Sequence, residues 1–271
     1  MYDSAPNILD QAVLMHGPRD LLARYIAHAD DSVRELGVRL RISRDFDRLV
    51  ALNTQHRGSW PKILPSFDPK YSDLSGDTAF FIEGIDQSGD TVVTSAGRLY
   101  DHGDRSLASD LRSLRVLYDN PAPQVAAGES VVVSAPFAEH IWGRAMFSAV
   151  VWVRPDYRRH GLTKIVPRLT RAYALAQWNT PVFWMMIAPD LDKIGVTRAY
   201  GSWHVDGRLA MHLPSLRDDF EVLFCSMGQD ALIRDIANSV YETSVGDSRR
   251  IDTPMPNISL PLPRQGMSTL S

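Results

Sequence analysis

A continuous apolar run that ends in a basic turn constrains the fold of this chain more than any other feature. Residues 145–153, AMFSAVVWV, carry no charge, which is typical of a central strand buried on both faces. RPDYRRHG follows at 154–161 with a single glycine, Gly161. Apolar residues then recur every three or four positions from about Leu162 to Gln177. The sequence therefore predicts a buried strand, a tight basic turn and a helix.

This turn has the features of an anion site. The first N–H groups of a helix have no intrahelical partner, and the helix dipole adds positive charge, so a phosphate is stabilised there. Gly161 lets the backbone approach the anion, and Arg158, Arg159 and His160 add positive or titratable side chains. The pattern indicates a site for a polyphosphate-bearing ligand. A solvated basic turn between a core strand and a core helix explains these residues equally well.

Hydrophobic periodicity and turn residues predict the other elements. Helices are expected over 8–36, with a break at 17–20, and over 45–55, 191–201 and 228–242, with a further candidate at 106–118. Strands are expected over 37–43, 78–85, 91–100, 129–134 and 181–189, and a tight hairpin around Asp206 and Gly207.

Composition narrows the class of protein. The formal charge of -3 gives no global basic field for nucleic acid or anionic lipid. Cys225 is the only cysteine, so a disulfide framework or thiolate zinc site is excluded, and His204 and His212 show no metal-ligand pattern. No signal peptide or membrane-spanning run is visible at the sequence level. We therefore expect a cytoplasmic protein that binds neither membrane nor nucleic acid and holds no metal.

The segment VRPDYRRHGLT resembles the acyl-CoA-binding motif of the GNAT superfamily of acyltransferases. The order of the expected strands and helices across 37–215 also resembles the order in that superfamily. Thr163 departs from the motif, which has Gly or Ala there, and Pro167 removes an N–H from the second helical turn. The matching residues are Val153, Pro155, Tyr157, Arg158, Gly161 and Leu162.

The resemblance implies an α+β fold in which helices flank a mixed, mostly antiparallel central sheet. It places an acyltransferase domain at 37–240, after an N-terminal helical extension at 1–36 and before a Pro/Ser-rich tail at 241–271. In such proteins the turn amides would bind the pyrophosphate of coenzyme A, and the last strand residues would pair with its pantetheine arm. The residues implied in binding acetyl-CoA, or another acyl-CoA, as co-substrate are Val151, Trp152, Val153, Arg158, Arg159, His160, Gly161, Leu162 and Thr163.

The resemblance also implies where catalytic groups lie. Tyr200 occupies the place of the family's general acid, although it would equally close a helix as a core residue. Glu83 and Glu139 are candidates for the general base, although an exposed strand edge and a solvated loop explain them as well. The acceptor is expected to contact the aromatic-bearing loop from Trp60 to Tyr71 and the segment 101–142.

The function implied is transfer of an acetyl or other acyl group from acyl-CoA to an amine, by direct attack on the thioester. The acceptor is a small-molecule or peptide amine, and a homodimer is left open. The alternative is a non-catalytic module of the same fold that binds acyl-CoA or a protein partner. A lesser alternative is longer-chain transfer of the homoserine-lactone-synthase type.

Overall fold

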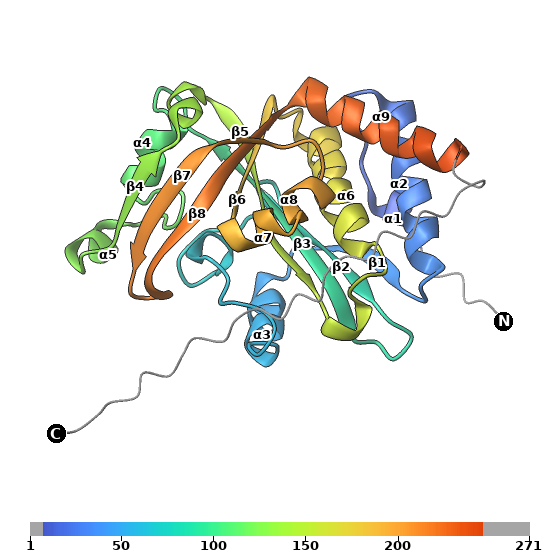
Figure 1. The fold of residues 1–271 in the computed structure, drawn as a ribbon, viewed down its shortest axis with the longest axis horizontal. Coiled ribbons are helices and arrows are strands. Elements are labelled where there is room, and N and C mark those ends of the chain that lie inside the picture. Colours follow the sequence, from blue (N-terminus) through green and yellow to red (C-terminus); the bar gives the residue numbers. More distant parts are fainter. Residues whose placement is uncertain (1–7, 246–271) are drawn as a thin grey trace.

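The computed structural model describes residues 8–245, without the side chains of 217, 218 and 242–245, and its centre is one eight-stranded sheet (Figure 1). The strand order is β1-β2-β3-β5-β6-β8-β7-β4. Every neighbouring pair is antiparallel except β5 and β6, so the predicted mixed, mostly antiparallel sheet is confirmed. The strands are β1 Arg39–Ser43, β2 Ala79–Ile85, β3 Thr91–Asp101, β4 Ser130–Ser134, β5 Arg144–Val153, β6 Val182–Ile187, β7 His204–Leu213 and β8 Arg217–Gly228.

Helices cover both faces of this sheet, as predicted. The long helices α2, α6 and α9 pack on one face, and α2 lies beside α9 (Figure 1). The helices α3 and α4 pack on the other face. The helices are α1 Ile8–Gln11, α2 Arg19–Arg34, α3 Phe46–Gln55, α4 Leu107–Arg112, α5 Ala122–Ala126, α6 Leu162–Trp178, α7 Pro189–Lys193, α8 Val196–Ala199 and α9 Gln229–Val245, with 3-10 turns η1 Pro65–Phe67, η2 Pro136–His140 and η3 Pro155–Tyr157.

Local sequence explains where these helices begin and end. The Asp45 side chain accepts a hydrogen bond from Arg48 N at 2.9 Å and so caps the start of α3. Ser106 caps α4 in the same way. Asn179 ends α6 in the left-handed conformation, which its short polar side chain tolerates. Pro167 lies inside α6, and the helix continues through it.

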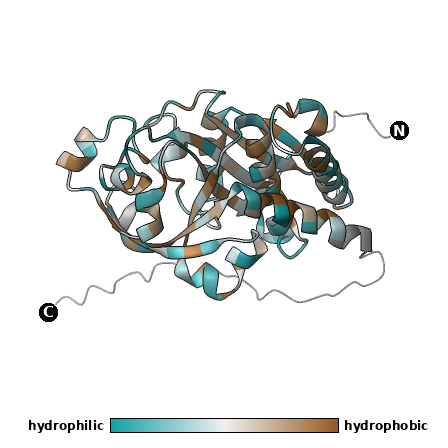
Figure 2. Ribbon diagram, turned by 90° about the horizontal axis from the view of Figure 1, so that it is seen from above, coloured by the Kyte–Doolittle hydropathy of each residue, from teal (hydrophilic) through white to brown (hydrophobic). Residues whose placement is uncertain are grey.

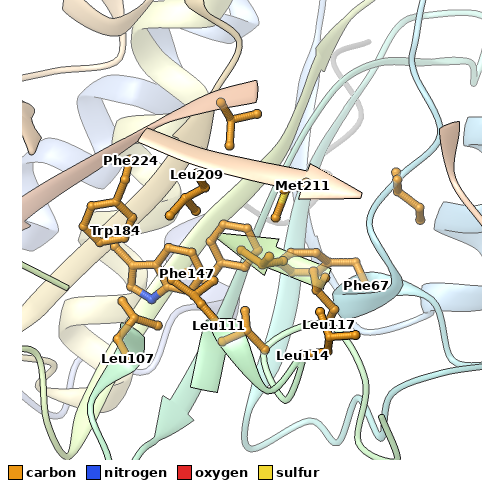
Figure 3. Close-up of a cluster of buried hydrophobic side chains, with 14 of the residues drawn as sticks. Phe67, Leu107, Leu111, Leu114, Leu117, Phe147, Trp184, Leu209, Met211 and Phe224 are labelled. Carbon is orange, nitrogen blue, oxygen red and sulfur yellow. The ribbon is translucent and has the colours of Figure 1, made fainter. Parts of the chain in front are cut away.

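The two faces have separate cores. On the face of α3 and α4, Phe67, Phe147, Trp184 and Phe224 pack with leucines from α4 and its following turn (Figure 3). On the other face, side chains of α2, α6 and α9 pack on β2 and β3. Helices at the surface of the molecule carry both hydrophobic and hydrophilic residues (Figure 2). The N-terminal segment therefore shares its core with the helix that follows the basic turn.

The hairpin predicted around Asp206 and Gly207 is wrong. Both residues lie inside the continuous strand β7, and the chain turns instead at 214–216, before a β8 that the sequence patterns did not predict. Gly207 marks a shift in register between β7 and β8, at a φ of 152°. Its backbone approaches Ser134 and Ala135 so closely that a side chain would not fit. Gly207 therefore allows a β-bulge and close packing of two backbone segments, and it does not form a turn.

Three further differences concern helices. The single helix predicted at 191–201 is two short helices, α7 and α8, separated by the left-handed Gly195. The helix candidate at 106–118 is shorter, because α4 ends at Arg112. The final helix, α9, runs to Val245, past the predicted boundary at 240, and the rest of the predicted tail lies outside the described residues. Within 8–245, no helix is both long and apolar enough to cross a bilayer.

We expect the substitution Gly207→Ala to destabilise the protein by about 3 kcal/mol, because the added methyl group meets the Ser134 backbone at a strained φ. Gly228→Ala is the matched control, since nothing lies within 4 Å of its added Cβ. Urea unfolding measures both. Equal free energies of unfolding in the two variants would contradict this account of β7.

Candidate functional site

The parallel strands β5 and β6 separate after three paired rows, and this separation forms the candidate site. Ala145–Phe147 pair with Val182–Trp184, and the last row is a stacked ring pair, Phe147 on Trp184, with centroids 4.0 Å apart (Figure 3). Beyond this row, the one strand of the described chain that pairs with β5 is β3, and the one that pairs with β6 is β8. Within the described chain, the facing edges of 148–153 and 185–187 therefore have no strand partner, and their backbone groups are available to a ligand.

A β-bulge changes the direction of the part of β5 that does not pair with β6. Val150 and Val151 together oppose the single residue Ser95, because Ala149 pairs with Ala96 and Trp152 with Thr94. Val150 has a φ of 58°, which is unusual for a β-branched residue. The Thr94 hydroxyl donates to the Val150 carbonyl at 2.9 Å and holds this conformation. Bulges bend a strand and recur next to functional sites, so this one turns the backbone of 150–153 relative to β6.

The turn after β5 presents unpaired N–H groups. Arg159 and Gly161 both have positive φ, 71° and 81°, and Gly161 caps α6 without a side chain. The Gly161 carbonyl accepts bonds from the N–H groups of 164 and 165. In the described structure, the backbone N–H groups of 159–163 donate to no carbonyl or side chain. They lie at the end of the β5–β6 gap, and a Cβ on Gly161 would enter open space.

The three basic side chains of the turn divide into two kinds. Arg158 is part of the framework: its Nε donates to Val153 O at 3.2 Å and its terminal nitrogen to Ser59 O at 3.4 Å. Burial lowers the pKa of this guanidinium. Arg159 and His160 are exposed beside the unpaired N–H groups. The structure therefore gives the turn two side chains that can meet an anion, with Arg158 holding it against β5.

On the α3 side, aromatic rings close over the end of β5. The Trp152 indole donates to Ser59 Oγ at 3.2 Å and stacks with Trp60, with centroids 4.9 Å apart. The His56 ring lies 4.6 Å from the Trp152 ring. The sequence predicts Trp60 as part of the acceptor-binding loop but does not single out His56 or Ser59. The sequence feature that could identify these two residues is their position at the end of α3, just before that loop. Trp60 and Phe67 are themselves buried in the core rather than rimming a pocket.

On the opposite side, Tyr200 borders the gap. It ends α8 and packs in one cluster with Met185 and Ile187, which lie in the part of β6 that pairs with β8 but not with β5. Burial raises the pKa of its hydroxyl, and the positive charge of Arg171 opposes that rise. Arg171, which is fully buried, donates to the Tyr200 carbonyl and so fixes this backbone. The phenol keeps its proton at neutral pH, as a proton donor must.

The two glutamates predicted as candidate bases lie elsewhere. Glu83 is fully buried on β2, not exposed at an edge, and its carboxylate binds Arg41 at 2.7 Å and Arg48 at 3.3 Å. Strand β3 separates it from β5. Glu139 precedes the start of β5, about 20 Å along the strand from the bulge. It pairs with Arg112, whose hydrogen bond lowers the pKa of its carboxyl. Neither placement supports a role as base.

A polar cavity of about 400 Å³ lies next to α8, lined by residues that include Thr197, Trp203 and Asp235. Asp235 binds Arg168 at 2.6 Å and so connects α9 to α6. Near Asp235, the guanidinium carbon of Arg171 lies 4.9 Å from the centroid of the Trp203 ring. This network stabilises the segment that carries Tyr200. Among the side chains that the structure describes, no group of three or more His, Cys, Asp or Glu is arranged to hold a metal ion.

No family model and no curated protein matches this sequence. Several solved structures to which the chain is similar are those of acetyltransferases. Arabidopsis thaliana NAA60 in complex with acetyl-CoA is 11% identical, with a TM-score of 0.44 over 71% of this chain and 99% of its own.

Two others give similar values. The ribosomal-protein-S5-alanine acetyltransferase from Vibrio fischeri is 13% identical, with a TM-score of 0.41 over 72% of this chain and 94% of its own. The aminoglycoside acetyltransferase AAC(6')-Ib, solved with coenzyme A and kanamycin, is 12% identical, with a TM-score of 0.41 over 73% and 98%. Values in this range establish neither activity nor substrate for this chain.

We expect Thr94→Val to lower the free energy of unfolding by about 1 kcal/mol, because it removes the hydrogen bond that holds the bulge. Amide exchange at Trp152, which pairs with Thr94, should accelerate. Thr180→Val is the matched control: Thr180 is equally buried, but its hydroxyl has no partner in the described structure, so its loss is neutral or stabilising. Equal effects of the two substitutions would contradict the role of Thr94.

Proposed function

We propose that this chain is an acyl-CoA-dependent N-acyltransferase that transfers an acetyl or other acyl group to an amine. One observation carries the proposal: the row of unpaired N–H groups at 159–163 lies at the end of a gap whose strand edges are also unpaired. A ligand that fits both features has an anionic group at one end and an extended amide-bearing arm. The pyrophosphate and pantetheine arm of coenzyme A have this chemistry.

The geometry suggests which part of the acyl-CoA molecule contacts which part of the gap. The pyrophosphate accepts hydrogen bonds from the turn at 159–163, beside the exposed side chains of Arg159 and His160. The pantetheine amides pair with the free edge of 151–153, as an added strand would. The thioester then lies near the bulge at Val150, between Trp152 on one face of the sheet and Tyr200 on the other.

The reaction needs no covalent enzyme intermediate. The lone pair of the acceptor nitrogen attacks the thioester carbonyl carbon, and the carbon–sulfur bond breaks. The departing thiolate takes a proton, for which the Tyr200 hydroxyl is the candidate donor because it packs against the β6 side of the gap. The attacking nitrogen loses a proton to a base. Orientation of the two reactants in one gap supplies much of the acceleration.

A second function, non-catalytic acyl-CoA binding, has its own support. Both predicted bases are held by arginines away from the gap, and burial raises the pKa of Tyr200, which weakens it as an acid. A protein of this kind would bind acyl-CoA at the same turn without releasing thiol. Binding and turnover therefore have to be measured separately.

We expect acetyl-CoA to bind with a dissociation constant in the micromolar range, and Gly161→Val to weaken binding at least about 10-fold, because its side chain enters the space at the turn. Isothermal titration calorimetry measures both. The matched control is Gly195→Val, since Gly195 also caps a helix at a φ near 86° with open space around its Cβ.

The control carries the same backbone strain at a different helix, so it should bind acetyl-CoA as the unmodified protein does. Absence of binding by the unmodified protein at high micromolar concentration would refute both proposed functions. Equal weakening by the two valines would assign the effect to strain rather than to the turn.

We expect Tyr200→Phe to lower the rate of thiol release from acetyl-CoA about 100-fold while acetyl-CoA still binds, because phenylalanine keeps the packing and removes the proton. Tyr241→Phe is the control, at an exposed tyrosine on α9. An unchanged rate in the Tyr200 variant would remove the acid assignment and leave the binding proposal standing.

A further inference from the structure

We infer that His56 is the base that takes the proton from the attacking amine. This inference rests on the proposed acyl transfer, and it fills the role that the placements of Glu83 and Glu139 leave open. It concerns an imidazole at the end of α3 that the sequence patterns did not mark.

The position of the ring is the first argument. His56 packs against Trp152 with centroids 4.6 Å apart, and Trp152 follows the bulge at Val150 and Val151 on the strand that borders the gap. The ring lies on the face of the sheet opposite Tyr200, because Trp152 belongs to the core of α3 and Tyr200 to the cluster of α8. A base on one face and an acid on the other can serve the nitrogen and the sulfur of one tetrahedral centre.

The backbone around His56 is fixed, as a catalytic side chain requires. Its N–H donates to Leu52 O at 3.1 Å, and its carbonyl accepts from the N–H groups of Ser59 at 2.9 Å and Trp60 at 3.0 Å. Ser59 in turn accepts from Trp152 through its hydroxyl and from Arg158 through its carbonyl. The end of α3 is thus tied both to the gap strand and to the anion-binding turn.

The imidazole is also available. His56 is half-buried, and within the described part of the chain no hydrogen bond or ion pair engages its ring nitrogens. Three other histidines differ, because each lies within 3.3 Å of an aspartate oxygen: His102 with Asp110, His204 with Asp206 and His212 with Asp219. His102 is moreover buried in the core under α4.

The step balances without any further reactant. The amine nitrogen forms a bond to the thioester carbon, and its excess proton moves to the unprotonated ring nitrogen of neutral His56. The carbon–sulfur bond breaks, and Tyr200 protonates the thiolate. The proton on His56 then returns to solvent and Tyr200 is reprotonated, so that amide and thiol are the only products.

Two variants test the assignment, with thiol release from acetyl-CoA as the readout and butylamine, glycinamide, spermidine and water each supplied as acceptor. We expect His56→Asn and His56→Ala to lower kcat about 100-fold, while the dissociation constant of acetyl-CoA changes less than about twofold. Added imidazole should restore part of the activity of His56→Ala and none of that of a Tyr200→Phe protein. A merely structural role for His56 would give no such rescue.

His16→Asn is the matched control. His16 bonds to Ala176 near the far end of α6, about 20 Å along the helix from the anion-binding turn, so its activity should be unchanged. Full activity in both His56 variants, or loss without imidazole rescue, would overturn the inference while the acyltransferase proposal stands. If acetyl-CoA binds but the unmodified protein releases no thiol with any acceptor, the catalytic proposal and this inference fall together.

Discussion

The separation of β5 from β6 after the stacked pair of Phe147 and Trp184 is the feature on which the candidate site depends. Up to that row the two strands are bonded, and the rings, 4.0 Å apart, are part of a fully buried core. An aromatic pair of this kind adds about 1 kcal/mol beyond its burial, so the last row is firmly closed. Beyond this row the bulge at Val150 redirects β5, and two strand edges in the middle of the sheet have no partner strand among residues 8–245.

Unpaired strand edges inside a protein are costly unless another group satisfies them, and this cost is why we interpret the gap as a candidate ligand site. The surroundings agree with this interpretation. The turn at 159–163 adds unpaired N–H groups at the same end, and Arg158 fixes that turn to both β5 and the loop after α3. Aromatic side chains from α3 and α8 border the gap from the two faces of the sheet. One ligand can therefore contact all of these groups at once.

The same arrangement separates binding from catalysis. The unpaired N–H groups of the candidate anion site come from the backbone, whose conformation has positive φ at Arg159 and Gly161. Chemistry depends on side chains, and those of Glu83 and Glu139 are neutralised by arginines in structural positions. What remains near the gap is a phenol on one face and an imidazole on the other. Their surroundings suit different tasks, since the raised pKa of Tyr200 keeps its hydroxyl protonated, whereas the ring nitrogens of His56 have no hydrogen-bond partner in the described structure.

The sequence by itself determined the local elements on which this site is built: the buried strand at 145–153, the basic turn with its glycine, and the helix after it. Each follows from short-range causes, namely hydrophobic periodicity, helix capping and backbone freedom at glycine. Short-range sequence patterns gave a wrong prediction where contact with a distant residue sets the conformation of the chain. The sequence around Gly207 predicted a hairpin turn, because the neighbouring residues do not reveal that its backbone packs closely against Ser134.

Only the tertiary structure decided that β5 and β6 part after three rows, that Glu83 is buried between two arginines, and that His56 reaches Trp152. These contacts join residues tens of positions apart, and strand pairing and packing across the sheet set them rather than any local preference.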